Sequence, residues 1–238
     1  MERVQKVIAE LGYCSRRHAE KLILEGKVKV NGKTILELGT KVSKKDSIEV
    51  EGVVLDNNKN YEYYLLYKPR GVVSTSSDDK GRKTVVDLIN TQSRIYPIGR
   101  LDYDTTGVLL LTNDGKLANK LMKPNSEIDK VYIVKVDGIV TGYDIKRLRS
   151  GIVIDGKKTS RAIVKLKSIS KEKKTSMVEI IIHEGRNRQV RKMIEAIGKK
   201  VLKLRRERYA FLDLKGLKVG EYRRLSNKEI AVLYSLVK

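Results

Sequence analysis

The sequence predicts an α+β protein: a small two-helix plus hairpin unit, followed by a larger unit with a mixed, largely antiparallel sheet. Two observations lead to this fold class. Apolar residues at helical spacing occur in short segments, and the first two of these open the chain. Most of the remaining apolar segments have strand length, and helices are interspersed without a regular strand–helix–strand repeat. At 238 residues, the chain has room for one or two domains.

The first unit begins with a pair of helices. Apolar residues spaced i, i+3, i+4, i+7 predict a helix over residues 4–11, and Gly12 suits its C-terminal stop. Ser15 is a suitable N-cap for a second helix that ends near Gly26. Both helices would bury one apolar face.

A small β structure follows the two helices. Residues 27–30 alternate between polar and apolar, as a half-buried strand does, and Asn31-Gly32 is the strongest short signal for a hairpin. Further strands are expected at 34–36 and 47–50. Residues 56–60 are polar without periodicity, which predicts a linker. We therefore expect domains at residues 1–56 and 61–238.

The second unit is predicted to hold most of the strands. The first of them stops at Pro69, which cannot donate a hydrogen bond to a neighbouring strand. Ser226 is a suitable N-cap for the last helix. The expected strands are 61–67, 96–98, 108–111, 129–136, 152–156, 162–168, 177–182, 202–214 and 220–225, and short helices are expected at 84–89, 116–122 and from about 187.

The helix that starts near residue 187 has two contrasting faces. Four apolar residues at helical spacing would face the core, and four charged residues would share the opposite face. A basic helix face is most often simply solvated. The apolar set is Val190, Met193, Ile194 and Ile197, and the charged set is Arg188, Arg191, Lys192 and Glu195.

The composition narrows the range of partners. The chain has 51 Lys and Arg against 29 Asp and Glu, a formal net charge of +22, which favours an acidic polymer such as RNA, DNA or an anionic membrane surface. Cys14 is the only cysteine, so no intrachain disulfide and no multi-cysteine zinc site can form. The first twelve residues lack a signal-peptide core, and no run approaches the roughly 20 apolar residues of a membrane span. We expect a soluble, cytoplasmic protein.

Residues 99–115, GRLDYDTTGVLLLTNDG, are the most informative stretch of the chain. They place Arg100 and Asp102 in a loop directly before a short apolar run that predicts a strand buried on both faces. For an arbitrary loop, ordinary turn aspartates would be the simplest interpretation. This whole string, however, resembles the catalytic motif of the ribosomal RNA pseudouridine synthases that include small-subunit synthase A and large-subunit synthase B. The resemblance implies that Asp102 is the essential catalytic residue.

Three other strings resemble motifs of the same family. Lys68-Pro69-Arg70-Gly71 matches a turn near the active cleft. Lys130-Val131-Tyr132 matches a motif whose tyrosine offers a face to the target uracil, which implies that role for Tyr132. Residues 185–193, GRNRQVRKM, match the family's last motif, in which the arginine after Gln-Val pairs with the catalytic aspartate. That arginine is Arg191. The family fold implied is a mixed sheet with a central cleft.

Roughly residues 2–52 resemble a small RNA-binding domain first described in a ribosomal small-subunit protein. In that domain, the basic start of the second helix and the hairpin contact RNA phosphates. The resemblance places Arg16, Arg17, Lys27 and Lys29 at those positions. In the second unit we expect Arg100, Lys68, Arg186 and Arg188 to bind RNA as well.

The implied reaction breaks the bond from ribose C1′ to uracil N1 and rejoins the base through C5, so we expect no cofactor and no metal. The target base must first leave its stack, at a cost of a few kcal/mol. Asp102 would act either as a nucleophile at C1′ or as a base on the 2′ position, and both roles need an ionised carboxylate. A buried carboxylate stays ionised beside a positive charge, which Arg191 would supply. Arg100 would occupy the space that the flipped base vacates.

The leading hypothesis is an isomerase that converts uridine to pseudouridine in ribosomal RNA, and the strings at 205–209 and 216–220 favour the large-subunit (23S) branch. The alternative is a non-catalytic rRNA-binding ribosome-assembly factor, against which Asp102, Tyr132 and Arg191 argue. DNA binding by the N-terminal helices lacks an evident base-reading set. We expect ribosomal RNA as the partner of a monomer, with no membrane association and no obligate protein partner.

Overall fold

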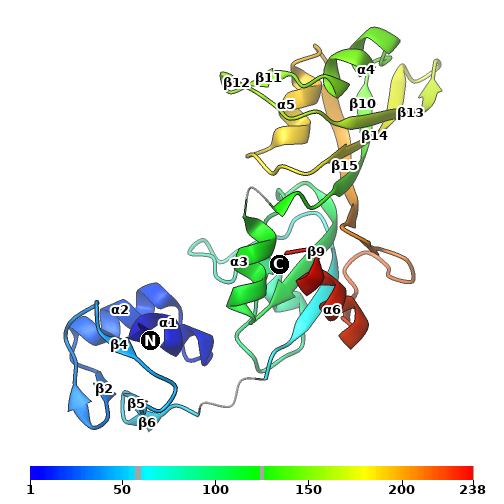
Figure 1. Cartoon of the computed structure of the whole chain (residues 1–238). Coiled ribbons are helices and arrows are strands. Elements are labelled where there is room, and N and C mark those ends of the chain that lie inside the picture. The colour runs from blue at the N-terminus through cyan, green and yellow to red at the C-terminus, as the bar shows by residue number, and fades with distance from the viewer. Residues whose placement is uncertain (57–59, 124–125, 238) are drawn as a thin grey trace. The chain divides into compact units, whose positions relative to one another are not determined.

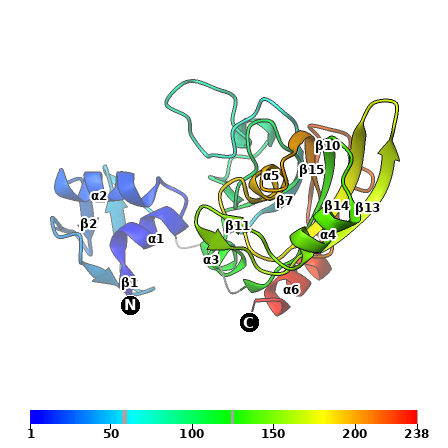
Figure 2. The same cartoon turned by 90° about the horizontal axis from the view of Figure 1, so that it is seen from above.

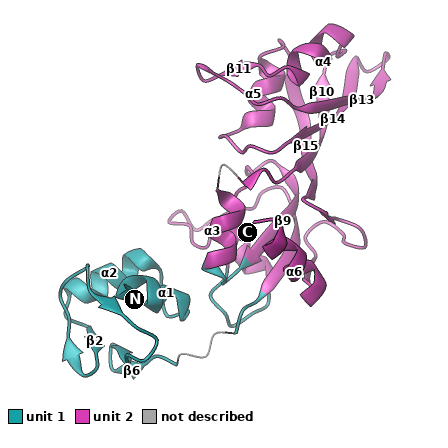
Figure 3. Cartoon of the chain, viewed as in Figure 1, with its two compact units in different colours: residues 1–62, 90–95, 112–115 teal, residues 63–89, 96–111, 116–238 magenta. Residues whose placement is uncertain are grey.

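The computed structural model describes residues 1–56, 60–123 and 126–237, and the chain divides into two compact units (Figure 3). Unit 1 contains residues 1–62, 90–95 and 112–115, and unit 2 contains residues 63–89, 96–111 and 116–238. Most of the expected linker at 56–60 lies outside the described residues. The domain boundaries 1–56 and 61–238 stay a prediction.

Unit 1 opens with the two expected helices, α1 (Val4–Glu10) and α2 (Arg16–Leu24). Ser15 caps α2, because its hydroxyl accepts a hydrogen bond from the His18 backbone N–H at 3.1 Å. The two apolar faces pack against the small sheet in one core, to which Val4, Ile8, Ala19, Leu22, Ile23, Val28, Val42, Ile48 and Val50 contribute buried side chains.

The hairpin of unit 1 turns at Asn31-Gly32, as the sequence predicts. Both residues have positive φ, 50° and 78°, which is the backbone that a tight two-residue hairpin requires. The turn joins β2 (Val28–Val30) to β3 (Lys33–Thr34), and the sheet continues to β5 and β6 in the order β3-β2-β5-β6. The remaining strands of the unit are β1 (Glu2–Arg3), β4 (Lys41–Val42), β5 (Ile48–Val50) and β6 (Val53–Val54); β1, β4 and β6 were not expected.

Unit 2 is organised around one nine-stranded sheet, in which seven strands follow the order β13-β14-β10-β15-β9-β7-β17, while β16 pairs with β15 and β8 pairs with β9. β15 and β9 pair in parallel, whereas β13, β14, β10 and β15 pair antiparallel in succession, so the mixed, largely antiparallel sheet is confirmed. The strands are β7 (Tyr63–Lys68), β8 (Tyr96–Ile98), β9 (Thr106–Thr112), β10 (Lys130–Asp137), β13 (Ile163–Ser170), β14 (Thr175–Ile182), β15 (Lys200–Tyr209), β16 (Leu212–Asp213) and β17 (Tyr222–Arg224), with β11 (Val153–Ile154) and β12 (Lys157–Lys158) in a separate hairpin.

Helices cover the two halves of the sheet separately (Figures 1 and 2). α4 (Gly142–Arg149) and α5 (Gln189–Glu195) share a core with β10, β13 and β14. α3 (Gly115–Met122) and α6 (Asn227–Ser235) share another core with β7 and β9. None of the helices in the described residues is long and apolar enough to cross a membrane.

β9 is the buried strand that the motif at 99–115 predicts, since all of its residues after Thr106 are buried. Its close pairing with β15 depends on Gly107. The φ of Gly107 is +124°, and a Cβ there would lie 2.2 Å from the backbone O of Arg206. Only glycine allows the two backbones to approach so closely. The loop that carries Asp102 is thereby held against β15.

One expected element differs in kind. Residues 84–89 form no α-helix but a single 3₁₀ turn, η1 (Val86–Leu88). The Asp87 carboxylate accepts hydrogen bonds from the Thr84 backbone N–H at 2.7 Å and from its hydroxyl at 3.0 Å, and a bridge joins Thr84 to Val73. Such bonds are typical of a helix start, but Ile89 is already extended, with φ −110° and ψ 120°, so the segment makes only one turn.

Candidate active site

The loop between β8 and β9 carries Asp102 and is fixed through its backbone. The Ser74 hydroxyl donates to the Leu101 O at 2.8 Å and accepts from the Leu101 N–H at 3.1 Å, and the Leu101 side chain is buried. The Thr105 N–H donates to the Asp102 O at 3.0 Å. The carboxylate of Asp102 therefore projects from a loop that is tied down on both sides.

Lys68, at the end of β7, is the centre of this support. Its ammonium donates to three backbone carbonyls, those of Pro69 at 3.0 Å, Asp102 at 3.1 Å and Thr105 at 3.0 Å. Burial lowers the pKa of Lys68 to about 8, and Asp102 and Asp104 partly oppose the shift. The expectation that Lys68 binds RNA is wrong, because its side chain has no exposed surface. It instead positions the catalytic loop.

Arg191, on α5, connects the loop to the second half of the sheet. Its Nε lies 3.4 Å from Asp102 Oδ2, and its Nη2 lies 2.9 Å from Asp104 Oδ1 and donates to the Thr105 hydroxyl at 3.2 Å. The predicted pairing of Arg191 with Asp102 is present in the structure. One guanidinium thus contacts the loop at three residues.

The burial of this pair differs from the expectation in two respects. Arg191 does not lie on a solvated face of α5, since its side chain is only 6% exposed. Asp102 is not fully buried, since 29% of its side chain remains exposed. The buried partner is therefore the cation, and the carboxylate stays accessible to a ligand.

Arg188 also reaches Asp102, from the N-cap position of α5. Its Nη1 lies 3.5 Å from Asp102 Oδ2, the same oxygen that Arg191 approaches, but its side chain is 45% exposed. Arg188 has left-handed backbone geometry, with a φ of 53°, which is uncommon for a residue other than glycine. From this position its side chain reaches the loop of Asp102.

A small pocket of about 70 Å³ brings the predicted residues together. Asp102 and Tyr132 line it from different elements, and Arg100, Arg186 and Arg188 complete its charged wall. The Tyr132 side chain is half-buried on β10 and packs against the core of α4 and α5. Of the five cations expected near the active cleft, all but Lys68 therefore lie around the Asp102 carboxylate and the Tyr132 ring. The four are Arg100, Arg186, Arg188 and Arg191.

Arg186 has a second role that the sequence did not indicate. Its guanidinium donates to the backbone O of Lys157 at 3.0 Å and of Lys158 at 2.7 Å, and it lies 3.4 Å from a Glu184 carboxylate oxygen. These bonds fasten the β11–β12 hairpin beside the pocket. Only part of the side chain remains available to a ligand.

The Lys130 ammonium, two residues before Tyr132, is similarly engaged with the protein. It donates to the backbone O of Ile128 at 2.9 Å and to that of His183, and it lies 5.8 Å from the centre of the Tyr209 ring. Burial lowers the pKa of Lys130 to about 8, and the nearby Arg206 guanidinium contributes to the shift. The lysine of the K-x-Y string thus anchors the strand that presents Tyr132.

The four cations of unit 1 that are expected to bind RNA differ in their ion pairing. Arg16 and Arg17 are exposed at the start of α2. Lys27 lies 2.9 Å from a carboxylate oxygen of Glu25, and Lys29 lies 2.8 Å from one of Glu49. Both lysines are therefore partly neutralised, whereas no ion pair of the two arginines is found among the described residues.

Sequence reasoning missed the residues that support the site. Ser74 acts through its hydroxyl on the backbone of Leu101, and Thr105 acts through its carbonyl and its hydroxyl; no motif spacing indicates either role. Gly107 was part of the quoted string, but only its approach to β15 explains why glycine is needed there. Within residues 1–56, 60–123 and 126–237, no group of His, Cys, Asp and Glu side chains is arranged to hold a metal ion.

Comparison with known proteins agrees with this geometry. The family model for RNA pseudouridylate synthase matches residues 62–196, and the model for the S4 domain matches residues 2–48. The ribosomal large subunit pseudouridine synthase B of Bacillus subtilis is 57% identical over 237 residues, which cover 99% of this chain and 97% of that protein. An uncharacterized RNA pseudouridine synthase of Aquifex aeolicus is 38% identical over 238 residues, covering 99% of this chain and 94% of that protein.

A solved structure extends the comparison to the fold. The crystal structure of a pseudouridylate synthase aligns with a TM-score of 0.68 and 32% sequence identity, covering 98% of this chain and 100% of that one. The shared fold, the match over more than half of the sequence and the identity to full-length relatives lead to one conclusion. This chain belongs to the RNA pseudouridylate synthase family and carries an N-terminal S4 domain.

Proposed function

We propose that this protein converts uridine to pseudouridine in large-subunit ribosomal RNA. The observation that carries the proposal is the Asp102 carboxylate, which is accessible at the wall of a pocket and held by the buried Arg191. The relative from Bacillus subtilis, which is named for the large ribosomal subunit, supports the choice of RNA. The reaction is an isomerisation: the C1′–N1 bond breaks, a C1′–C5 bond forms, C5 loses a proton and N1 gains one. No co-reactant is consumed.

Asp102 is the residue that acts on the ribose in this proposal. As a nucleophile it would form a bond to C1′ while N1 leaves, and as a base it would remove the 2′ proton. In either role the carboxylate must be ionised and must point at the sugar. Arg191 meets both needs, because it supplies a positive charge and fixes the loop through Asp104 and Thr105.

Tyr132 provides the surface against which the target base stacks. Its ring lines the same pocket as Asp102 and is only half-buried. The pocket holds about 70 Å³, whereas sites that enclose small-molecule ligands usually measure a few hundred. Entry of a nucleotide therefore requires lining side chains to move. Arg100 and Arg188 are the exposed cations of that lining, and we assign them to RNA phosphates and to the space left by the flipped base.

The S4 domain would bind the RNA through phosphate contacts and take no part in the chemistry. We propose a domain of residues 1–56 that contacts phosphates and a catalytic domain of residues 61–238. Arg16 and Arg17 are the strongest candidates in the first domain because they are exposed. Lys27 and Lys29 would have to exchange Glu25 and Glu49 for phosphate. Such contacts carry little sequence information but position the substrate.

The proposal places a monomer in the cytoplasm with ribosomal RNA as its partner and no obligate protein partner. The test is direct. Purified protein is incubated with transcripts of large-subunit and small-subunit ribosomal RNA, and pseudouridines are mapped at nucleotide resolution. We expect modification at discrete positions of the large-subunit transcript. Modification of the small-subunit transcript alone would overturn the choice of RNA, and tight binding without any pseudouridine would favour the non-catalytic assembly factor.

A further inference from the structure

The sheet of unit 2 has a second face that does not contain the active-site pocket. In the described part of the chain, the core residues from β10, β13 and β14 all point to the side of α4 and α5, and Tyr132 lies on that same side. The alternate residues point the opposite way. The strand registers place them in three rows across four strands, which are Ile163–Ile181–Val131–Arg208, Lys165–Glu179–Ile133–Arg205 and Ser168–Met177–Lys135–Lys203. We call this grid the open face.

The open face is strongly basic. Its three rows hold five cations and one acid, Glu179. Lys167 and Glu207, at the irregularities of β13 and β15, pair with residues of the rows and bring the totals to six cations and two acids. The next register pair beyond the rows is Asp137 with Lys200. Arg205 lies 2.6 Å from Glu207, and Lys167 lies 3.9 Å from Glu179. Among the described residues, the other four cations make no ion pair. The six are Lys135, Lys165, Lys167, Lys203, Arg205 and Arg208, and all except the half-buried Lys135 are exposed.

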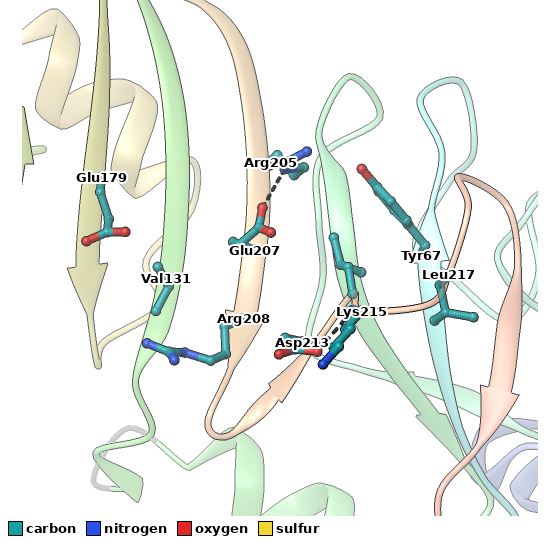
Figure 4. Close-up of a pocket in the computed structure, with 10 residues that line it drawn as sticks. Tyr67, Val131, Glu179, Arg205, Glu207, Arg208, Asp213, Lys215 and Leu217 are labelled. Carbon is teal, nitrogen blue, oxygen red and sulfur yellow. Dashed lines mark hydrogen bonds and ion pairs between the residues drawn. The ribbon is translucent and has the colours of Figure 1, made fainter. Parts of the chain in front are cut away.

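The cations flank an apolar centre. The middle strands contribute Ile133, Met177 and Ile181, which are all only partly buried. The two strands at the margins of this four-strand grid, β13 and β15, carry five of the six cations. Because neighbouring strands are about 4.8 Å apart, three spacings separate these two columns by about 14 Å. Figure 4 shows Glu179, Val131 and Glu207 side by side along three of these strands.

Two hollows open on this face. The first, of about 460 Å³, is lined by Val131, Arg205 and Arg208 from the grid and by Tyr67 from β7 (Figure 4). The second, of about 360 Å³, runs from Lys135 and Lys203 to Asp104, which Arg191 holds in the catalytic loop. The open face is therefore continuous with the back of the loop that presents Asp102.

We propose that the open face is a second RNA-binding surface, and that it takes a double-helical segment of the substrate RNA outside the catalytic cleft. Two columns of cations about 14 Å apart suit two phosphate backbones, and duplex RNA is read mainly by shape and by backbone contacts. A single strand would need a series of aromatic stacking platforms. The three rows contain no aromatic side chain, and among the described residues that line the two hollows Tyr67 is the single one. A second copy of the chain would bring like charges together. This second binding surface depends on the proposed function in one respect, namely that the ligand is RNA.

The test compares two triple variants of the full-length protein. The first, Lys135→Gln with Lys165→Gln and Lys203→Gln, removes three charges from the open face. The matched control, Lys120→Gln with Lys123→Gln and Lys228→Gln, removes three charges from exposed positions elsewhere in unit 2. A third protein with arginine at the three open-face positions keeps the charge. The probes are a perfectly paired RNA duplex of about twenty base pairs, a single strand of equal length and polyglutamate.

We expect the first variant to bind the duplex more weakly and to reduce the slope of log affinity against log salt by about 3, one unit for each lost phosphate contact. The control and the arginine variant should stay close to the parent. Equal losses in the first variant and the control, or a loss confined to the single strand, would overturn the proposal. Unchanged RNA binding with lost polyglutamate binding would make the face a protein-docking surface, which also overturns it. Pseudouridine formation by the parent is measured separately, so failure of the proposed function is distinguishable.

Discussion

Replacement of Arg191 by leucine should damage turnover far more than the same replacement of Arg188, although each removes one positive charge near Asp102. Arg191 is buried, forms ion pairs with Asp102 and Asp104 and donates a hydrogen bond to Thr105, whereas Arg188 is 45% exposed and reaches Asp102 alone at 3.5 Å. Hydrogen bonds to charged groups contribute about 1.5–3 kcal/mol, and exposed ion pairs contribute about 0.2–1 kcal/mol. At about 1.4 kcal/mol per factor of ten, Arg191→Leu should slow the reaction roughly 100-fold and Arg188→Leu at most about fivefold.

Single-turnover rates at saturating enzyme measure this difference without a contribution from weaker RNA binding. RNA affinity and its salt dependence provide the internal control, because the exposed Arg188 can lose one phosphate contact whereas the buried Arg191 should lose none. Thermal unfolding of both variants checks that the fold is retained. Equal losses of turnover would mean that the burial of Arg191 and its contacts with Asp104 and Thr105 add nothing to the reaction, and its role in positioning Asp102 would be abandoned.

Three further predictions concern the supports of the site. Burial lowers the pKa of Lys68 to about 8, so turnover should fall as the pH rises above 8, because the neutral amine has too few N–H groups for its three carbonyl partners. The Lys68→Met variant should be slow at every pH. A turnover profile of the parent protein that stays flat to pH 10 would contradict this prediction. Gly107→Ala should lower the melting temperature by several degrees, because about 1 kcal/mol corresponds to 2–4 °C in a domain of this size, whereas Gly142→Ala, which meets nothing within 4 Å, should not. Removal of residues 1–56 should leave a folded catalytic domain with weaker RNA binding, and unchanged affinity would exclude the S4 domain as an anchor.

Much of the fold follows from local pattern. The Asn31-Gly32 hairpin, the Ser15 and Ser226 caps and the buried strand β9 are all present in the structure, because each depends on a few neighbouring residues. The exceptions depend on partners distant in sequence. Residues 84–89 form a 3₁₀ turn rather than a helix, and the bridge from Thr84 to Val73 that helps to fix this segment is not visible in the segment itself.

Prediction of the active site from local sequence pattern has the same limit. The motif resemblance identified Asp102, Tyr132 and Arg191, and the structure brings them to one place. Their burial could not be read from periodicity. Helical spacing put Arg191 on a polar face, but the loop of Asp102 and Asp104 covers that part of α5. The sequence predicts Lys68 as an RNA-binding surface cation. Only the contact of β7 with the catalytic loop shows that its ammonium donates to backbone carbonyls instead.

The central claim is that the carboxylate of Asp102 performs the chemistry. Asp102→Asn keeps the size and most contacts of the side chain but removes its charge, and Asp104→Asn is the matched control, since Arg191 contacts both residues and only Asp102 lines the pocket. The measurement is pseudouridine formed per enzyme on large-subunit ribosomal RNA, with RNA affinity recorded in parallel. We expect no pseudouridine from Asp102→Asn with affinity within a few-fold of the parent, and substantial product from Asp104→Asn. Appreciable pseudouridine formation by purified Asp102→Asn would contradict the account.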